Sequence, residues 1–94
     1  MDKEKIIQLL TEEGYPSFMW ERTIEKLENL DPAVRVAFRE LMEGHSPFIS
    51  IEGHSFDSLV HEYRMKPIGA LLTLDWLVRC PQEALMSLKQ PIKL

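Results

Sequence analysis

Three histidines and one cysteine, namely His45, His54, His61 and Cys80, are the classic metal-binding residue types in this sequence. Zinc sites in short chains place such ligands at fixed short intervals, for example two cysteines separated by two residues or two histidines separated by three. The intervals between these four residues are nine, seven and nineteen positions. We therefore expect surface or loop histidines and no metal site.

Cys80 and the serines are the candidate nucleophiles. Cys80-Pro81 resembles the short Cys-Pro motif of some heme-regulated proteins, but proline is also common at the first position of a helix. The serines lie at turns or helix caps or have no motif around them, and the four glycines do not form a phosphate-binding loop. The sequence predicts a protein that is not an enzyme and has no cofactor.

The charge of the chain is uneven. The net charge is -4, with ten acids against six bases in residues 1–43 and five of each in residues 44–94. Proteins that bind nucleic acid usually carry a basic excess, because contacts with phosphates supply much of their affinity. We expect nucleic acid to be an unlikely partner.

Length and composition favour one domain in a reducing compartment. The 94 residues fit a single domain, with an acidic part at 1–43 and a second part at 44–94. The single cysteine excludes an internal disulfide, and no apolar run approaches the ~18 residues of a membrane span. We expect a cytoplasmic protein with neither a signal peptide nor a membrane segment.

Helix-boundary residues and the spacing of apolar side chains predict a mainly α fold of about six helices. The expected helices are residues 2–13, a segment capped by Ser17, Pro32 to Gly44, residues 55–64, residues 67–79 and a segment that begins at Pro81. Phe48 to Ile51 has high β-propensity and predicts a short strand. Because a lone strand leaves its backbone unpaired, we expect it to pair with Pro91 to Leu94 in a minimal two-stranded ribbon.

The helix at 67–79 is unusually apolar. Between Pro67 and Val78 its only charged side chain is Asp75, which we expect to pair with Arg79 four residues later. A helix that is apolar on nearly all sides is buried on nearly all sides, so this helix is expected to form the centre of the domain.

Two interpretations of this helix remain open. It is either simply the central core helix, or part of it near Trp76 is covered by another protein chain or a second copy of this one. The second interpretation predicts a partner-binding patch made by Trp76, Ile68, Leu72 and Trp20.

The order strand, helix, tight turn and helix over residues 48–79, with "SFDSLVHEY" followed by "RMK" and "PIGALLTLDWL", resembles winged-helix-type helix-turn-helix domains. The resemblance implies a winged-helix-like second half of the chain. In the members of that superfamily that bind DNA, the second helix of the pair enters the major groove. The resemblance therefore implies Arg64, Lys66 and Arg79 as DNA contacts, although Thr73 and Asp75 are the only other polar residues that this helix offers.

The function that these observations favour is a regulatory or interaction module without catalytic activity. It would bind a partner protein or itself through an apolar patch near the helix at 67–79. The alternative is a DNA-binding transcriptional regulator of the helix-turn-helix type.

Overall fold

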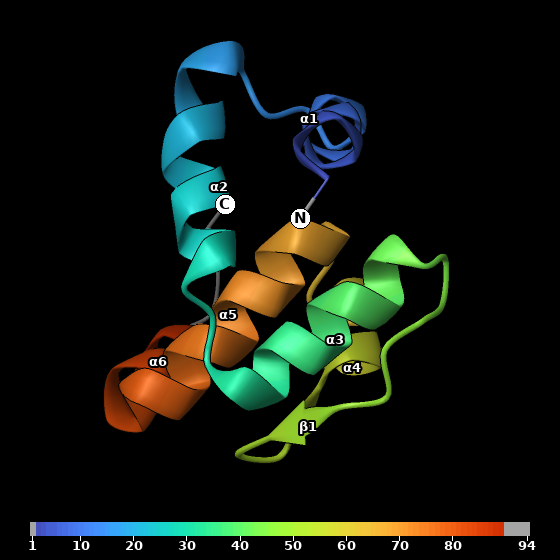
Figure 1. The fold of residues 1–94 in the computed structure, drawn as a ribbon. Helices are drawn as coiled ribbons and strands as arrows, with labels where there is room; N and C mark the ends of the chain where they lie inside the picture. Colours follow the sequence, from blue (N-terminus) through green and yellow to red (C-terminus); the bar gives the residue numbers. More distant parts are fainter. Residues whose placement is uncertain (1, 90–94) are drawn as a thin grey trace.

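The computed structural model describes residues 2–89 and confirms a mainly α fold (Figure 1). Over these residues the chain forms six α-helices, a 3₁₀ turn and a small antiparallel sheet. In chain order the elements are α1 (Lys3–Glu12), η1 (Ser17–Met19), α2 (Trp20–Glu28), α3 (Pro32–Met42), β1 (Ser50–Ile51), β2 (His54–Ser55), α4 (Phe56–His61), α5 (Pro67–Arg79) and α6 (Pro81–Lys89). Among these helices, none is long and apolar enough to cross a membrane.

Most helices begin at the residues that the sequence indicates. Asp31 accepts a hydrogen bond from the backbone N–H of Ala33 at 3.1 Å and thereby caps α3. Ser55 caps α4 in the same way, through the N–H of Ser58 at 3.0 Å. The expected cap at Ser17 is wrong: Ser17 opens the 3₁₀ turn η1 instead, and α2 begins at Trp20 without a side-chain cap.

The strand pairing differs from the prediction. β1 is shorter than expected and pairs with β2, in a register that places Ser50 opposite Ser55 and Ile51 opposite His54. The two strands are joined by Glu52 and Gly53, with φ angles of 52° and 81°. Two central residues with positive φ match the twist of a tight hairpin, and closing so short a loop costs little entropy. The partner segment predicted for this strand, 91–94, lies outside the described residues.

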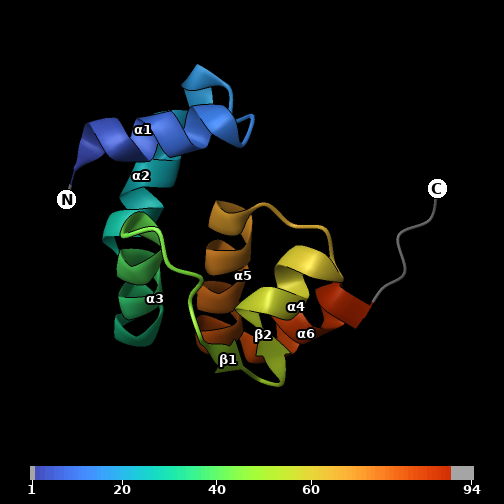
Figure 2. The same cartoon turned by 90° about the vertical axis from the view of Figure 1, so that its right-hand side faces the viewer.

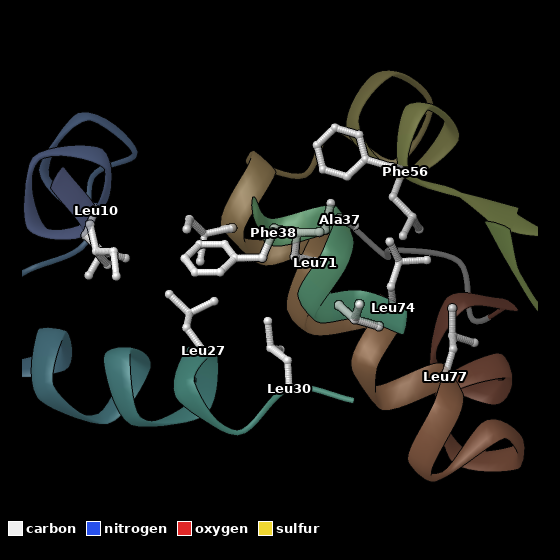
Figure 3. Close-up of a cluster of buried hydrophobic side chains, with 14 of the residues drawn as sticks. Leu10, Leu27, Leu30, Ala37, Phe38, Phe56, Leu71, Leu74 and Leu77 are labelled. Atoms are coloured by element: carbon white, nitrogen blue, oxygen red, sulfur yellow. The ribbon is translucent and has the colours of Figure 1, made fainter. Parts of the chain in front are cut away.

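α5 is the centre of the fold. It packs most extensively against α6, α4 and α3, and it also contacts β1. Figure 2 shows α3 alongside one side of α5, with α4 and α6 on the other side. The buried residues of α5 are Ile68, Ala70, Leu71, Leu74 and Leu77. Figure 3 labels Leu71, Leu74 and Leu77 within the apolar cluster.

The helices α1 and α2 pack against each other. The junctions at their ends are hydrogen-bonded to α5. The first of these contacts joins the end of α1 to the beginning of α5: the Glu13 carboxylate accepts the backbone N–H of Ile68, at 3.0 Å to Oε1 and 3.2 Å to Oε2. Lys66, the residue before α5, provides no side-chain cap. Glu13 therefore satisfies one of the free N–H groups of the first turn of α5 from a distant part of the chain.

Burial raises the pKa of Glu13 above its ordinary value of 4.5, because partial desolvation outweighs the hydrogen bond from Ile68 and the attraction of Lys66, both of which lower it. A carboxyl group whose pKa is higher in the folded state holds its proton more tightly there than in the unfolded chain. Its contribution to stability is therefore complete below the unfolded pKa and is lost as the pH rises through the folded value.

The free energy of unfolding of Glu13→Gln is accordingly expected to increase relative to that of the wild type as the pH rises from below 4.5 towards neutrality. The reason is that glutamine has no charge to desolvate. Urea unfolding of both proteins across this pH range measures the effect. Glu25→Gln, on the exposed side of α2, is the matched control and should not reproduce the trend. A wild-type advantage that grows with pH would contradict the assigned direction of the pKa shift.

Candidate functional site

A groove lies between the second half of α2 and the outer face of α5. Its volume is about 580 Å³. We call it the α2–α5 groove, and its lining residues are Lys26 and Asn29 at the α2 end with Leu72, Thr73, Asp75, Trp76, Arg79 and Cys80 at the α5 end.

The periodicity of α5 explains which of its residues line the groove. Leu72, Trp76 and Cys80 are spaced four residues apart and therefore share one face of the helical segment. The neighbouring helices cover the other faces but leave this one partly open. Leu72 is half-buried, and Trp76 is 38% exposed. Residues 2–89 thus cover most of the central helix and leave Trp76 at the partly open edge.

Asp75 and Arg79 hold the wall of the groove in place. The expected ion pair forms, with 2.8 Å between Arg79 Nε and Asp75 Oδ2. The other carboxylate oxygen of Asp75 accepts the backbone N–H of Asp31 at 2.8 Å, and the Arg79 guanidinium also donates to the carbonyl oxygen of Asn29. This clamp fixes the connection between α2 and α3 against α5, and so it sets the position of the α2 end of the groove.

Two of the four predicted patch residues, Trp76 and Leu72, line the groove. Ile68 is fully buried, so its assignment to an exposed patch is wrong. The helical wheel places Ile68 on the same side as Leu72, but Ile68 lies in the first turn of α5, where Glu13 binds its backbone N–H and its side chain belongs to the core cluster. Trp20 is half-buried, donates its indole N–H to the carbonyl oxygen of Tyr15 at 2.9 Å, and is not part of the groove lining.

The uncovered face continues towards the beginning of α5. A second hollow, of about 430 Å³, lies beside the connection between α1 and α2, and Thr73 lines both hollows. Met19, whose side chain is 38% exposed, lines the second hollow. Sequence patterns did not identify Met19 or Thr73 as site residues, because a methionine in a turn and a threonine within an apolar helix carry no signal of their own.

The three bases of the DNA-binding alternative are distributed over the two ends of α5. Arg64 and Lys66 are exposed in the turn before the helix, whereas Arg79 is its last residue. Thirteen helical residues separate the two ends by roughly 18–20 Å. The Arg79 guanidinium is also engaged by Asp75 and Asn29.

The histidines and the cysteine lie in separate places. His54 makes an edge-on aromatic contact with Tyr63 at 5.6 Å, and His61 lies 3.8 Å from Asp57 on the exposed side of α4. His45 is exposed in the loop after α3, and Cys80 is exposed at the edge of the groove. Across residues 2–89, no three His, Cys, Asp or Glu side chains are close enough to bind one metal ion.

Comparison of the chain with protein-family models, with curated proteins and with solved structures finds no match. The resemblance to winged-helix domains therefore remains a prediction from the sequence.

Proposed function

We propose that this protein is a non-catalytic interaction module that binds an extended or helical segment of another protein in the α2–α5 groove. The observation that carries the proposal is Trp76, which is 38% exposed on a face of the central helix that residues 2–89 leave partly open. Tryptophan is enriched among the residues that dominate binding energy at protein interfaces.

The groove suits a partner segment in which an apolar side chain is flanked by an acidic one. Leu72 and Trp76 offer apolar contact, while Lys26 at the rim is exposed and has no ion pair among residues 2–89. A partner carboxylate beside an apolar anchor would complement this rim. We favour a different protein over a second copy, because two chains of net charge -4 repel each other.

The observations favour this function over DNA binding. The partly open face of α5 presents Leu72, Thr73 and Trp76, and its single base, Arg79, is already paired. Base reading in the major groove depends on polar and basic side chains along the inserted helix. The single thiol of Cys80 also suits a reducing compartment, and we propose a cytoplasmic location.

Affinity capture with matched variants tests the proposal. Trp76→Arg places a charge in the groove, and Met86→Arg makes the same kind of change at an exposed apolar residue of α6 that is 65% exposed. A partner should be recovered with the wild type and with Met86→Arg, and its measured affinity for Trp76→Arg should be about thirtyfold weaker, which corresponds to roughly 2 kcal/mol.

Two results would contradict this function. One is equal binding of the partner to both variants, which would place the contact elsewhere. The other is binding to duplex DNA that weakens steeply with salt and is lost when Arg64 and Lys66 are replaced by glutamine, which would favour the transcriptional regulator.

A further inference from the structure

A cleft separate from both the α2–α5 groove and the hollow beside it lies between the beginning of α1 and the outer face of α3. Its volume is about 420 Å³. Three bases line it, Lys5 from α1 and Arg35 and Arg39 from α3, together with the apolar side chains of Phe38 and Met42. Phe38 is almost fully buried and Met42 is half-buried, so the apolar part of the cleft belongs to packed structure.

The concentration of positive charge in this cleft is unexpected in the acidic part of the chain. Residues 1–43 contain six bases against ten acids, and three of these bases line this one cleft. Arg35 and Arg39 are one helical turn apart, where two like charges destabilise a helix. An anion between them would reverse that repulsion.

In the part of the chain that the structure describes, the acids near the cleft form no direct ion pair with these bases. Asp31 and Glu43 each lie four residues from one of the arginines, yet the ion pairs found among residues 2–89 include neither. Asp31 instead caps α3 through the N–H of Ala33. The carboxylate of Asp2, which lines the cleft with Glu43, accepts the backbone N–H of Lys5 at 3.3 Å and so caps α1.

The guanidinium groups keep donors available. Arg35 uses Nη2 to donate to the carbonyl oxygen of Leu30 at 3.1 Å. This hydrogen bond holds the Arg35 side chain towards the connection between α2 and α3. A guanidinium carries five N–H donors in a planar fork that suits carboxylate and phosphate oxygens. Arg35 therefore retains most of its donors, and no hydrogen bond to the side chain of Arg39 or Lys5 is present among the described residues.

We propose that this cleft binds a small organic anion whose carboxylate or phosphate group contacts Arg35, Arg39 and Lys5 and whose short apolar part lies against Phe38 and Met42. The volume is within the range of small-molecule sites. Charge complementarity selects the head group, and the apolar residues select a ligand with a hydrocarbon part over a bare ion.

Titration of the full chain with defined probes tests this site. The probes are octanoate and octyl phosphate, which distinguish the two head groups, with octylammonium and inorganic phosphate as controls. Chemical shifts of the isotope-labelled protein should change saturably around Lys5, Phe38 and Arg39 with at least one of the two anionic amphiphiles. We expect a dissociation constant of about 1 mM or tighter, and at least tenfold weaker binding of octylammonium and of inorganic phosphate.

Matched variants assign the binding to the cleft. Arg35→Gln/Arg39→Gln and, separately, Lys5→Gln should each weaken binding, the double variant by at least about tenfold. Arg22→Gln, an exposed base of α2 outside the cleft, should leave it unchanged. The Lys5 variant leaves α3 intact and keeps the test valid if the double variant does not fold.

Three outcomes would overturn the proposal: equal binding of octylammonium, undiminished binding of the anions by the cleft variants, or no saturable change with either anion. Because no residue of this cleft lines the α2–α5 groove, failure here leaves the Trp76 proposal standing, and the reverse also holds.

Discussion

Leu71→Ala is expected to lower the free energy of unfolding by about 2–5 kcal/mol, the range found when a buried leucine is truncated and a cavity remains. Leu71 is fully buried in α5, and Figure 3 shows it in the apolar cluster that also contains Phe38 of α3. A domain of this size has a total stability of about 5–15 kcal/mol. One side chain of the central helix therefore accounts for a large share of the total.

Urea unfolding of Leu71→Ala and of Leu72→Ala measures this difference. Leu72 is the adjacent residue of the same helix, but it is half-buried at the groove, where the truncated site can fill with water instead of leaving a cavity. The Leu72 variant should lose clearly less stability than the Leu71 variant. Equal losses would contradict the assignment of the two residues to a buried and an open face of α5.

Asp75→Ala is expected to lower the free energy of unfolding by about 2–3 kcal/mol. The carboxylate, whose side chain is only 16% exposed, accepts the backbone N–H of Asp31 and pairs with Arg79. A hydrogen bond to a charged group contributes about 1.5–3 kcal/mol, and an exposed ion pair in a helix adds about 0.3–0.5 kcal/mol. The first of these contributions dominates, so the hydrogen bond from Asp31 in the α2–α3 connection contributes more to stability than the ion pair with Arg79.

Two further variants separate these contributions. Arg79→Gln removes the ion pair and the hydrogen bond to the carbonyl oxygen of Asn29 but leaves the bond from Asp31 to Asp75, and it should cost about 1 kcal/mol or less. Asp57→Ala removes a carboxylate of α4 that is exposed together with its neighbour His61 at 3.8 Å, and it should have a similarly small effect. If Arg79→Gln were as destabilising as Asp75→Ala, the contacts of Arg79 rather than the hydrogen bond from Asp31 to Asp75 would hold the α2–α3 connection.

The local part of this structure could be predicted from the sequence. Asp31, Pro32 and Ser55 act through neighbouring backbone groups, so their positions alone indicate where α3 and α4 begin. The apolar composition of residues 67–79 was likewise sufficient to place α5 at the centre, because a helix without a polar face has to be covered.

Three features that the sequence did not predict have different physical causes. The cap that Glu13 provides for α5 joins positions 55 residues apart, and Ile68, whose N–H it binds, is fully buried. The hairpin was missed because Glu52 adopts a positive φ, which a glutamate rarely does. The cleft at Arg35 and Arg39 was also missed, because the net acidity of residues 1–43 masks the local grouping of bases.

The central claim is that the chain leaves Trp76 partly open for another protein. Trp20→Phe makes Trp76 the single tryptophan, and quenching of its fluorescence by acrylamide then measures its exposure over a series of protein concentrations. We predict that acrylamide quenches Trp76 to the degree typical of a partly exposed indole, and that this quenching is the same from the lowest to the highest protein concentration. Shielding at every concentration would show that the chain covers Trp76 itself, and shielding that grows with concentration would show that a second copy does; either result would contradict the claim.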